Sequence, residues 1–488
     1  MSQFSEVLKS LISASGISIY KLAKDAGVDR TLIHKALTDE RMPSAEFVAK
    51  VSDALLLSPF EKRELQKSYE IKKIGVHRYT QRSQVKQLIE LIAQTENERR
   101  ICTQNGALTP DQLIPLYEFA DDAEKVQYGH YAINNLIRCV IEHESIKNRD
   151  SRIDFFVPSG FGFLFDELSI SSMRKPALNI RHITALHKKS SYPVQSSASN
   201  IAALMNIIKL AYLGGTGYSP YYFYAETEGF YTMAPMPYYI LTSTHLVTLN
   251  ATLDAAILYR SADVMKYYAN LFQETMRHAT PFLKRADNFL DIISYYLLID
   301  RRDNSGKTCL IGAQPCLGHY ITEELTEKKL IQGLDRREEI KALAKKHYAN
   351  LQKIAVANSG LFSIAGLEYL LKTGYITDVP SSYVHPLDRR EIGDLISQFL
   401  ADTRNGRFAS FAIDPSKFTI PMFTSLLVDK LSGIHILTYS DVDLNALFIN
   451  EPSIVEAFED FCDSIEGSDL VYSQEETIEI LENFLMRL

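Results

Sequence analysis

Residues 18–37, SIYKLAKDAGVDRTLIHKAL, constrain the fold of this chain more than any other stretch. Apolar residues recur within it at three- and four-residue steps, which predicts two short helices. Ser18 and Asp29 precede these helices and can cap them, because their side-chain oxygens accept otherwise unpaired backbone N–H groups. Gly27 stands between the helices, where a helix end commonly needs a left-handed residue. The stretch therefore predicts two helices joined by a tight turn, the second with a polar outer face.

The flanking sequence predicts three more helices. Apolar steps favour a first helix that Gly16 ends and a fourth helix through Leu55. Residues 58–61, SPFE, form a capping box with proline at the first helical position, which predicts a fifth helix through about Tyr69. Residues 1–70 thus predict a small all-α domain with the layout of a DNA-reading helix-turn-helix.

Roughly residues 4–70 resemble the lambda-repressor/Cro-like helix-turn-helix family, also called the xenobiotic-response-element family. The likeness rests on the five-helix order, on LAKDAGV at 22–28, on Ile33 in the core and on the Pro43-Ser44 turn. It implies a transcriptional regulator, most often a repressor, whose third helix faces DNA bases. The positions that it places near bases or phosphates, together with the neighbouring Lys21, are the candidate DNA-binding residues: Ser18, Lys21, Arg30, Thr31, His34, Lys35 and Arg41.

The chain departs from this family at three positions. Ile19 stands where glutamine is frequent, and it cannot make a polar DNA contact, so we expect the second helix to anchor less well. Leu37 and Asp39 stand where a glutamate and a glycine are frequent. The alternative is a helical bundle that shares the layout and binds a protein instead of DNA.

Charge is distributed unevenly along the chain. Residues 1–80 hold 13 Lys and Arg against 10 Asp and Glu, a net of +3, while the whole chain is −8, so the rest carries −11. This asymmetry suits a DNA-binding head on an acidic body. A net of +3 is weak for one head on DNA, so we expect a homodimer on a double-stranded operator.

Composition sets broad limits. With 488 residues, 46% hydrophobic and 23% charged, the chain is typical of a multidomain soluble protein. No apolar run approaches the ~20 residues that cross a bilayer, and no signal pattern begins the chain, so we expect a cytoplasmic protein with no membrane partner. The five cysteines indicate reduced thiols. Cys309 and Cys316 near His319 leave a zinc or redox site open, but buried structural cysteines are the simpler interpretation, so we expect no metal and no cofactor.

Beyond the head, the periodicity changes several times. It predicts a helical connector or dimerisation region at 71–148, an α/β sensor lobe at 149–285, a mainly helical region at 286–400 and a second α/β lobe at 401–488, in which 422–431 reads as a helix. The fold class that follows is multidomain: an all-α helix-turn-helix head and a larger α/β or α+β body for sensing and dimerisation.

Two segments of the body share an apolar pattern. Residues 255–275 align with 445–465, and each follows a strand containing Ile-Leu-Thr, at 240–242 and 436–438. Either the body is a two-lobed repeat or both segments are a common strand–turn–helix unit. A repeat would weakly resemble the two-lobed phospholipase D-like sensor domains of some bacterial regulators. The catalytic His–Lys pair of that superfamily is absent, since His187-Lys188 has the wrong spacing, and this implies a non-catalytic domain.

The sequence also lacks the common catalytic fingerprints, among them a complete phosphate-binding loop, HExxH and GxSxG. We therefore predict that the chain is not an enzyme. An enzyme or toxin-like effector carrying a DNA-binding head remains the alternative, because new active sites evade motif searches.

The tract 212–239 holds ten Tyr and Phe residues and is the candidate ligand site. Tyrosine combines flat apolar area with a hydroxyl, which suits a pocket for a small-molecule or peptide effector. The candidate ligand-binding residues are Tyr221, Tyr222, Tyr224 and Tyr231. The alternative is a sheet that uses tyrosine as a good strand former.

Overall fold

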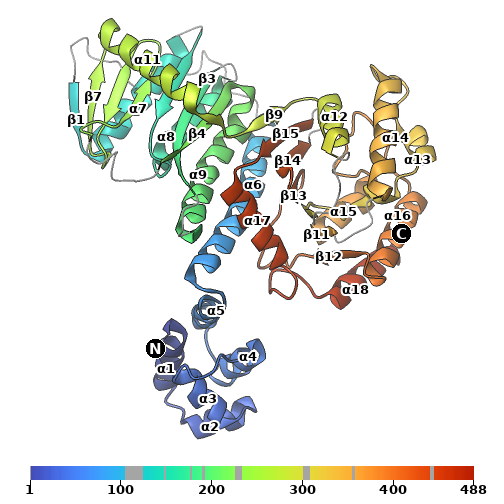
Figure 1. Cartoon of the computed structure of the whole chain (residues 1–488). Helices are drawn as coiled ribbons and strands as arrows, with labels where there is room; N and C mark the ends of the chain where they lie inside the picture. The colour runs from blue at the N-terminus through green and yellow to red at the C-terminus, as the bar shows by residue number, and fades with distance from the viewer. Residues whose placement is uncertain are drawn as a thin grey trace. The chain divides into compact units, whose positions relative to one another are not determined.

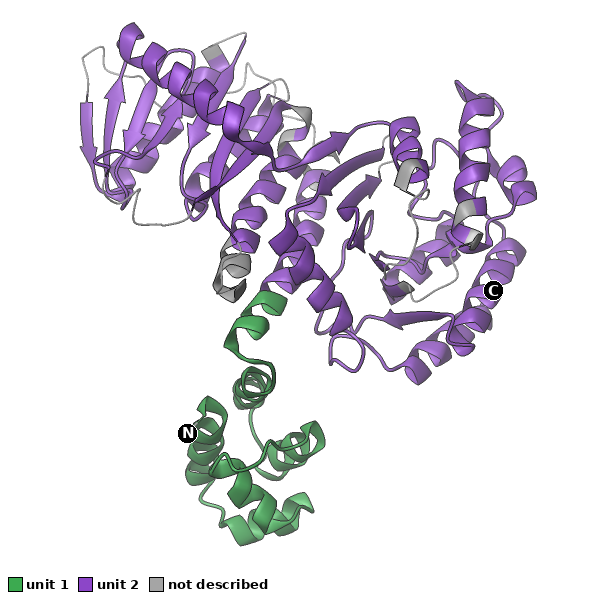
Figure 2. Ribbon diagram, in the orientation of Figure 1, with its two compact units in different colours: residues 1–83 green, residues 84–488 purple. Residues whose placement is uncertain are grey.

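The computed structural model describes residues 2–104, 125–147, 150–175, 178–188, 193–225, 234–299, 308–353, 358–439 and 444–488. The chain divides into two compact units, residues 1–83 and residues 84–488 (Figure 2). The first unit is all-α, and the second contains two mixed sheets with helices (Figure 1). The predicted fold class, an all-α head followed by a larger α/β body, is confirmed. The finer division at residues 70, 148, 285 and 400 stays a prediction.

The first unit, here called the head, follows the predicted helix order. Its helices are α1 (Gln3–Ser15), α2 (Ile19–Ala26), α3 (Arg30–Leu37), α4 (Ala45–Ala54) and α5 (Pro59–Ile74), and α6 (Val76–Gln104) begins after Gly75. The predicted caps at Ser18, Asp29 and Ser58 are confirmed, since each side chain accepts from a backbone N–H in the first turn. Gly27 is left-handed, with φ 61°, as the turn requires. One apolar core joins the five helices: Phe4, Leu8, Leu22, Ile33, Val51 and Leu65 are all fully or nearly fully buried.

Asp39 ties the loop after α3 to the rest of the head. Its φ is +60°, so it adopts the left-handed conformation that glycine usually supplies. Its carboxylate accepts from the Ser2 hydroxyl at 2.6 Å, the Ser5 hydroxyl at 3.0 Å and the Lys72 ammonium at 2.6 Å. These bonds, led by the one from Lys72, hold the pKa of Asp39 far below its usual range. Asp39 therefore links α1 to α5.

The second unit, here called the body, begins with the rest of α6 and continues with a first lobe, lobe A. Its sheet has the strand order β1-β7-β6-β5-β2-β3-β4-β8. The elements of lobe A are β1 (Lys125–Tyr128), α7 (His130–Lys147), β2 (Arg152–Phe156), α8 (Gly162–Arg174), β3 (Asn179–His187), α9 (Pro193–Gly214), β4 (Tyr218–Ala225), β5 (Tyr238–Leu241), β6 (Leu246–Leu249), β7 (Ala255–Tyr259), α11 (Ala262–His278) and β8 (Thr280–Pro281).

Lobe B follows, and its sheet has the order β12-β11-β10-β13-β14-β15-β9. Its elements are β9 (Lys284–Ala286), α12 (Phe289–Ile299), β10 (Thr308–Ile311), η3 (Leu317–Tyr320), α13 (Glu323–Lys329), α14 (Arg337–Lys353), β11 (Asn358–Phe362), α15 (Ile364–Thr373), α16 (Arg389–Arg404), β12 (Phe408–Ala412), β13 (Thr424–Asp429), β14 (Gly433–Tyr439), β15 (Leu444–Ile449), α17 (Pro452–Asp463) and α18 (Gln474–Leu485).

The two lobes are structural repeats. In each, three parallel strands (β2, β3, β4 and β10, β11, β12) continue into an antiparallel series (β5, β6, β7 and β13, β14, β15). A further strand, β1 or β9, pairs with the last of the series, and a helix, α11 or α17, follows it (Figure 1). The segments 255–275 and 445–465 occupy the same place in each lobe. The two-lobed repeat is thus confirmed.

Two details of the sequence interpretation were wrong. The Ile-Leu-Thr segments are not equivalent, because 240–241 belongs to β5 whereas 436–438 belongs to β14, whose counterpart is β6. The stretch 422–431 is not a helix: β13 pairs with a strand on each side, and its Leu426 and Val428 are buried in the core. The mainly helical region 286–400 also supplies β10 and β11, which are too short to stand out by periodicity.

The lobes share a continuous apolar core, in which α9 packs against α17. Asn200 donates to the Ser453 hydroxyl at 3.0 Å across this junction, and Tyr224 donates to Glu451 at 2.8 Å. Within the described part of the chain, no helix combines the length and the apolar character that a membrane span requires.

Candidate functional site

The first candidate site is the outer face of α3. Ile33 and Ala36 are buried against the head's core, so the opposite side of this eight-residue helix faces outward. Arg30, Thr31 and His34 are exposed there. Arg30 Nε donates to His34 Nε2 at 3.4 Å, one helical turn away. Of the three predicted base-facing residues, Arg30 and Thr31 are exposed and Lys35 is partly buried, while His34, predicted on the phosphate side, is exposed beside Arg30.

Asp29 limits what Thr31 can do. The Asp29 carboxylate accepts from the Thr31 backbone N–H at 2.7 Å and also from the Thr31 hydroxyl. These two bonds lower the pKa of Asp29. Because the hydroxyl proton is already donated, Thr31 offers a partner its methyl group and its oxygen lone pairs.

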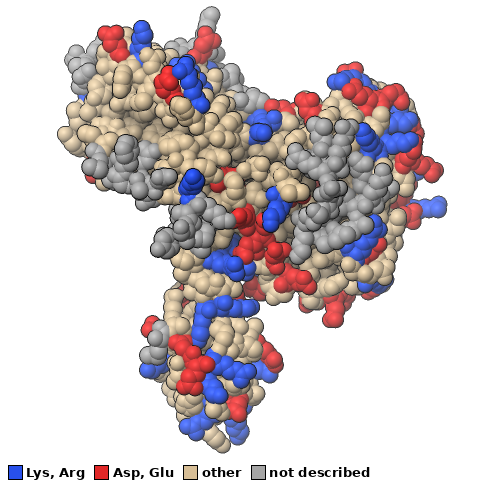
Figure 3. Space-filling view, in the orientation of Figure 1, with Lys and Arg blue, Asp and Glu red and all other residues tan. Residues whose placement is uncertain are grey.

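The other two predicted phosphate-side residues, Ser18 and Arg41, and the neighbouring Lys21 also lie on the surface of the head. Ser18, Lys21 and Arg41 are exposed, and the Ser18 hydroxyl accepts from the Lys21 backbone N–H at 3.3 Å. Lys and Arg side chains appear on the visible face of the head among Asp and Glu (Figure 3). The structure places all seven candidate DNA-binding residues on α2, α3 and their flanking turns.

The tyrosine tract does not converge on one point. Tyr221 and Tyr222 are neighbours on β4, so their side chains leave opposite faces of the sheet. Tyr222 is buried and packs edge-to-face on Phe282, with ring centroids 5.3 Å apart. The Tyr224 hydroxyl donates a hydrogen bond to the Glu451 carboxylate. Tyr231 lies outside the described residues. A pocket built from these four side chains stays a prediction, and the cavity described next is lined by other residues.

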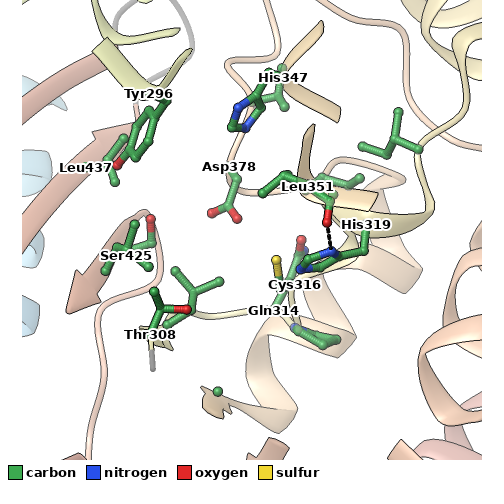
Figure 4. Close-up of a pocket in the computed structure, with 18 of the residues that line it drawn as sticks. Tyr296, Thr308, Gln314, Cys316, His319, His347, Leu351, Asp378, Ser425 and Leu437 are labelled. Carbon is green, nitrogen blue, oxygen red and sulfur yellow. Dashed lines mark hydrogen bonds between the residues drawn. The ribbon is translucent and has the colours of Figure 1, made fainter. Parts of the chain in front are cut away.

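A cavity of about 250 Å³ lies in lobe B, between one face of its sheet and helices α12 and α14 (Figure 4). Four small residues on neighbouring strands line its floor beside larger ones such as Leu310 and Leu427: Thr308 on β10, Gly360 on β11, Ser410 on β12 and Ser425 on β13. Small side chains leave space between a sheet and the helices that cover it. These four residues therefore contribute part of the open space.

Lobe A shows what the same face looks like when it is filled. On β2, β3 and β4, this face carries Phe155, His182 and Tyr218, which are all buried. Phe155 and His182 stack with ring centroids 4.3 Å apart, and His182 Nδ1 lies 2.9 Å from the Tyr218 hydroxyl. Burial lowers the pKa of His182 to about 3, so the ring is neutral. On this face of lobe A, large buried side chains thus occupy the strands that correspond to β10, β11 and β12.

Asp378 projects into the cavity from the loop after α15 (Figure 4). Gln314 fixes this loop, because its amide donates to the carbonyls of Gly366 and Tyr375 and accepts from the Thr377 N–H at 3.0 Å. Burial raises the pKa of Asp378 to about 6. Over the described ranges, no hydrogen bond or ion pair engages its carboxylate.

Burial keeps several of the groups around Asp378 neutral. Burial and the Asp378 charge raise the pKa of Tyr348 and of Cys316 to about 12. Burial lowers the pKa of His319, whose Nδ1 lies 2.9 Å from the Leu351 carbonyl. Asp429 also lines the cavity but accepts from the turn at Ser432. Among the described residues that line the cavity, none is Lys or Arg.

The cysteines near this cavity do not assemble a metal site. Cys309 lies on β10 and belongs to the core shared by the lobes, beside Cys462, whereas Cys316 faces the cavity. Across the part of the chain that the structure describes, no three His, Cys, Asp or Glu side chains are grouped to hold a metal ion.

A buried polar cluster joins α6 to lobe B next to the cavity. Glu96 on α6 is 4% exposed and accepts from the backbone of Met422 and Phe423 and from the Thr424 hydroxyl at 2.8 Å. Burial raises the pKa of Glu96. Tyr212 on α9 bonds to Thr424 and accepts from the Thr438 hydroxyl at 2.6 Å. Thr424 immediately precedes Ser425 in the cavity floor.

Comparison with known proteins gives no family. No protein-family model matches the chain, and no curated protein sequence matches it. Among solved structures, polyphosphate kinase from Porphyromonas gingivalis is 10% identical over 75% of this chain and 56% of its own length, with a TM-score of 0.22. Phosphatidylserine synthase from Haemophilus influenzae Rd KW20 is 9% identical over 80% and 96%, with a TM-score of 0.23. The archaeal chromatin protein TrmBL2, whose structure is said to show a novel mode of DNA binding, is 11% identical over 57% of this chain and 100% of its own length, with a TM-score of 0.23.

These neighbours correct one prediction. We predicted that the chain is not an enzyme, and that a phospholipase D-like body would be non-catalytic. That prediction was wrong, because two of the similar structures are a kinase and a synthase by name, so absent motifs do not exclude catalysis. At TM-scores this low they identify neither a reaction nor a catalytic residue here.

Sequence reasoning missed the cavity and Asp378. The available signal was a set of short strands with Gly360, Ser410 and Ser425 where lobe A has large residues. That contrast is visible only once the strands of the two lobes are aligned by their pairing.

Proposed function

We propose that this chain is a DNA-binding transcriptional regulator whose α3 reads an operator. The observation that carries the proposal is the exposed set Arg30, Thr31 and His34 on a helix that a capped turn and a buried opposite face hold in place. In a helix-turn-helix, a side-chain set of this kind at the start of the second of the two helices, here α3, suits the major groove.

The candidate residues contact two parts of the DNA in this proposal, the base edges and the phosphates. Arg30 donates two hydrogen bonds to a guanine, the commonest specific contact, and Lys35 reaches a base edge from the next turn. Ser18, Lys21, His34 and Arg41 contact phosphates. Phosphate contacts set the register of the protein on DNA and carry most of its salt dependence.

We propose that the protein binds DNA as a homodimer and acts as a repressor. Residues 1–80 carry a net charge of only +3, so two heads give the affinity that one lacks. A two-fold dimer also matches a palindromic operator. Light scattering should give twice the chain mass of 55.3 kDa, and a strict monomer with and without DNA contradicts the dimer.

The DNA test begins with operators selected from random duplexes by the full-length protein. Arg30→Ala should weaken operator binding by about 1–3 kcal/mol and relax the sequence preference. The Arg30→Ala, Lys35→Ala double variant should bind all sequences almost equally. Lys67→Ala, which removes an exposed charge from α5, is the matched control and should keep the preference. Unchanged operator affinity in the double variant overturns the proposal.

We further propose that the body binds an effector that changes operator affinity. Such a ligand must bind the DNA-competent and incompetent states unequally. A coupling of about 1–3 kcal/mol changes operator affinity by roughly 5- to 150-fold. The hollow face of lobe B supports this role.

A further inference from the structure

We propose that the cavity in lobe B binds a small organic cation, an amine with an apolar body, whose nitrogen sits against the Asp378 carboxylate. The inference names the class of effector for the proposed regulator. Amine binding itself does not require DNA binding, so the two can fail separately.

The charge of the cavity selects a cation. Asp378 and Asp429 are its carboxylates, and no Lys or Arg stands among its described lining residues. Asp429 is satisfied by its own turn, whereas Asp378 has no hydrogen-bond or ion-pair partner in the described chain. Asp378 is partly exposed and lines the cavity, and a ligand ammonium supplies its carboxylate with an opposite charge and hydrogen-bond donors. The cation therefore gains a charge-assisted hydrogen bond to a carboxylate that no described residue engages.

The walls suit an apolar body next to that nitrogen. Tyr296 and Phe289 on α12 and Tyr348 on α14 line the cavity on the side opposite the sheet. Aromatic faces attract cations and pack against flat apolar groups. The floor adds the hydroxyls of Thr308 and Ser425, which can orient a polar substituent.

The same features argue against anions. Phosphates, nucleotides and carboxylates need Lys, Arg or several N–H donors. His319 is held neutral by burial, and Asp378 repels a second negative charge. The cavity is equivalent to roughly eight waters at ~30 Å³ each, which limits the ligand to a small molecule.

The repeat shows that this space is not an inevitable property of the fold. The corresponding face of lobe A is closed by Phe155, His182 and Tyr218. An unfilled cavity costs packing energy. Because large side chains occupy this face in lobe A, we infer that the cavity in lobe B is retained for a function. Gln314, which makes three hydrogen bonds to hold the Asp378 loop, keeps the carboxylate aimed at that space.

The test uses the full chain and three probes of similar shape: phenethylamine, phenylacetate and 2-phenylethanol, titrated by calorimetry at pH 7.5. Phenethylamine should bind most tightly, and phenylacetate at least about tenfold more weakly, because a charge-assisted bond is worth about 1.5–3 kcal/mol. Asp378→Asn keeps the side-chain shape and should lower phenethylamine affinity at least about tenfold, with 2-phenylethanol affinity unchanged. Glu324→Gln, the same charge change on the exposed surface of α13, should leave all three unchanged.

A second variant tests the place of binding. Ser410→Leu fills the floor and should abolish binding of all three probes, with a wild-type circular-dichroism spectrum and a cooperative unfolding transition as evidence that the body is folded. Amine affinity that is unchanged in Asp378→Asn, phenylacetate binding as tight as phenethylamine, or no saturable amine binding at millimolar concentration each overturns the proposal. The Arg30→Ala, Lys35→Ala variant should still bind phenethylamine, which separates this failure from failure of the DNA proposal.

Discussion

Asp39 combines two roles at a position where backbone conformation favours glycine. Its left-handed φ costs energy, while its carboxylate holds Ser2, Ser5 and Lys72. Asn also tolerates this conformation but lacks the charge, so Asp39→Asn isolates the electrostatic part. At pH 7 we expect the variant to lower the free energy of opening the head by about 1–3 kcal/mol. Hydrogen exchange of α1 in the full chain measures this change.

The pH dependence of this contribution has a definite sign. The folded pKa of Asp39 lies below the unfolded value of about 4, so the stabilisation is present above pH ~4 and is lost as pH falls toward the folded value. Asp39→Asn should remove that acid-side loss. Asp53→Asn, at an exposed pair with Lys62, is the control and should change opening by less than about 1 kcal/mol. Equal effects of the two variants contradict the role of Asp39.

Asp378 behaves in the opposite way. Its folded pKa of about 6 is above the unfolded value of about 4, so stability falls as pH rises through this window. Asp378→Asn should therefore stabilise the chain above pH 6, by up to ~3 kcal/mol, and make no difference below pH 4. Thermal unfolding from pH 4 to 8 measures this difference, and a variant that is less stable at pH 8 contradicts it.

Amine binding should follow the same titration, with phenethylamine affinity rising as pH rises through about 6. Cys316, Tyr348 and Tyr439 face Asp378 but remain neutral in this range, because burial raises the pKa of each. His347 also lines the cavity, so His347→Gln identifies any share of the pH dependence that belongs to the imidazole. A pH profile that is abolished by His347→Gln and kept by Asp378→Asn contradicts the assignment.

At the scale of single elements, the first turn of α15 approaches the backbone at Ala313 very closely. A Cβ on Gly366 would lie 1.8 Å from the Ala313 carbonyl oxygen, in the segment that leads to Gln314 and Cys316. Gly366→Ala must displace this backbone, and we expect a loss of at least about 3 kcal/mol in unfolding free energy. In α16, a Cβ on Gly393 meets only the Leu488 side chain at 3.7 Å, so Gly393→Ala should be neutral or stabilising by up to ~1 kcal/mol. Urea denaturation compares the two, and similar losses contradict the close-approach argument.

Elements with local signals were predictable from the sequence. The helices of the head carry their caps, turns and apolar spacing within a few residues, as at Ser18, Gly27 and Ser58. The prediction for β13 was wrong because its apolar residues also fit a helix, and only its pairing with β10 and β14 shows that it is a strand. The cavity could not be predicted for the same physical reason. Gly360 and Ser410 are ordinary in sequence, and their meaning comes from being neighbours on a sheet whose strands are far apart in the chain.

At the scale of the whole molecule, α6 connects the end of α5 to the residues that directly precede Ser425 in the cavity floor. The helix begins at Val76, directly after Gly75 ends α5, and Glu96 near its other end is buried against 422–424. The next residue, Ser425, faces the cavity and its hydroxyl lies 3.2 Å from the Tyr439 hydroxyl. A ligand that shifts β13 therefore changes the contacts that hold α6. This continuity is the physical basis on which we expect an amine in the cavity to alter operator affinity.

The prediction is quantitative and reciprocal. Saturating phenethylamine should change operator affinity by a factor between roughly 5 and 150, and saturating operator should change phenethylamine affinity by the same factor. Glu96→Gln weakens the charge-assisted bonds to 422–424, so it should bring both factors toward 1 while each ligand alone still binds. Glu98→Gln, two residues along α6 and exposed, is the matched control and should keep both factors. If phenethylamine binds the cavity and leaves operator affinity unchanged in the wild-type chain, the effector role fails, while α3 and the amine site stand on their own tests. If Glu96→Gln and Glu98→Gln keep the same factor, the coupling runs through another part of the body.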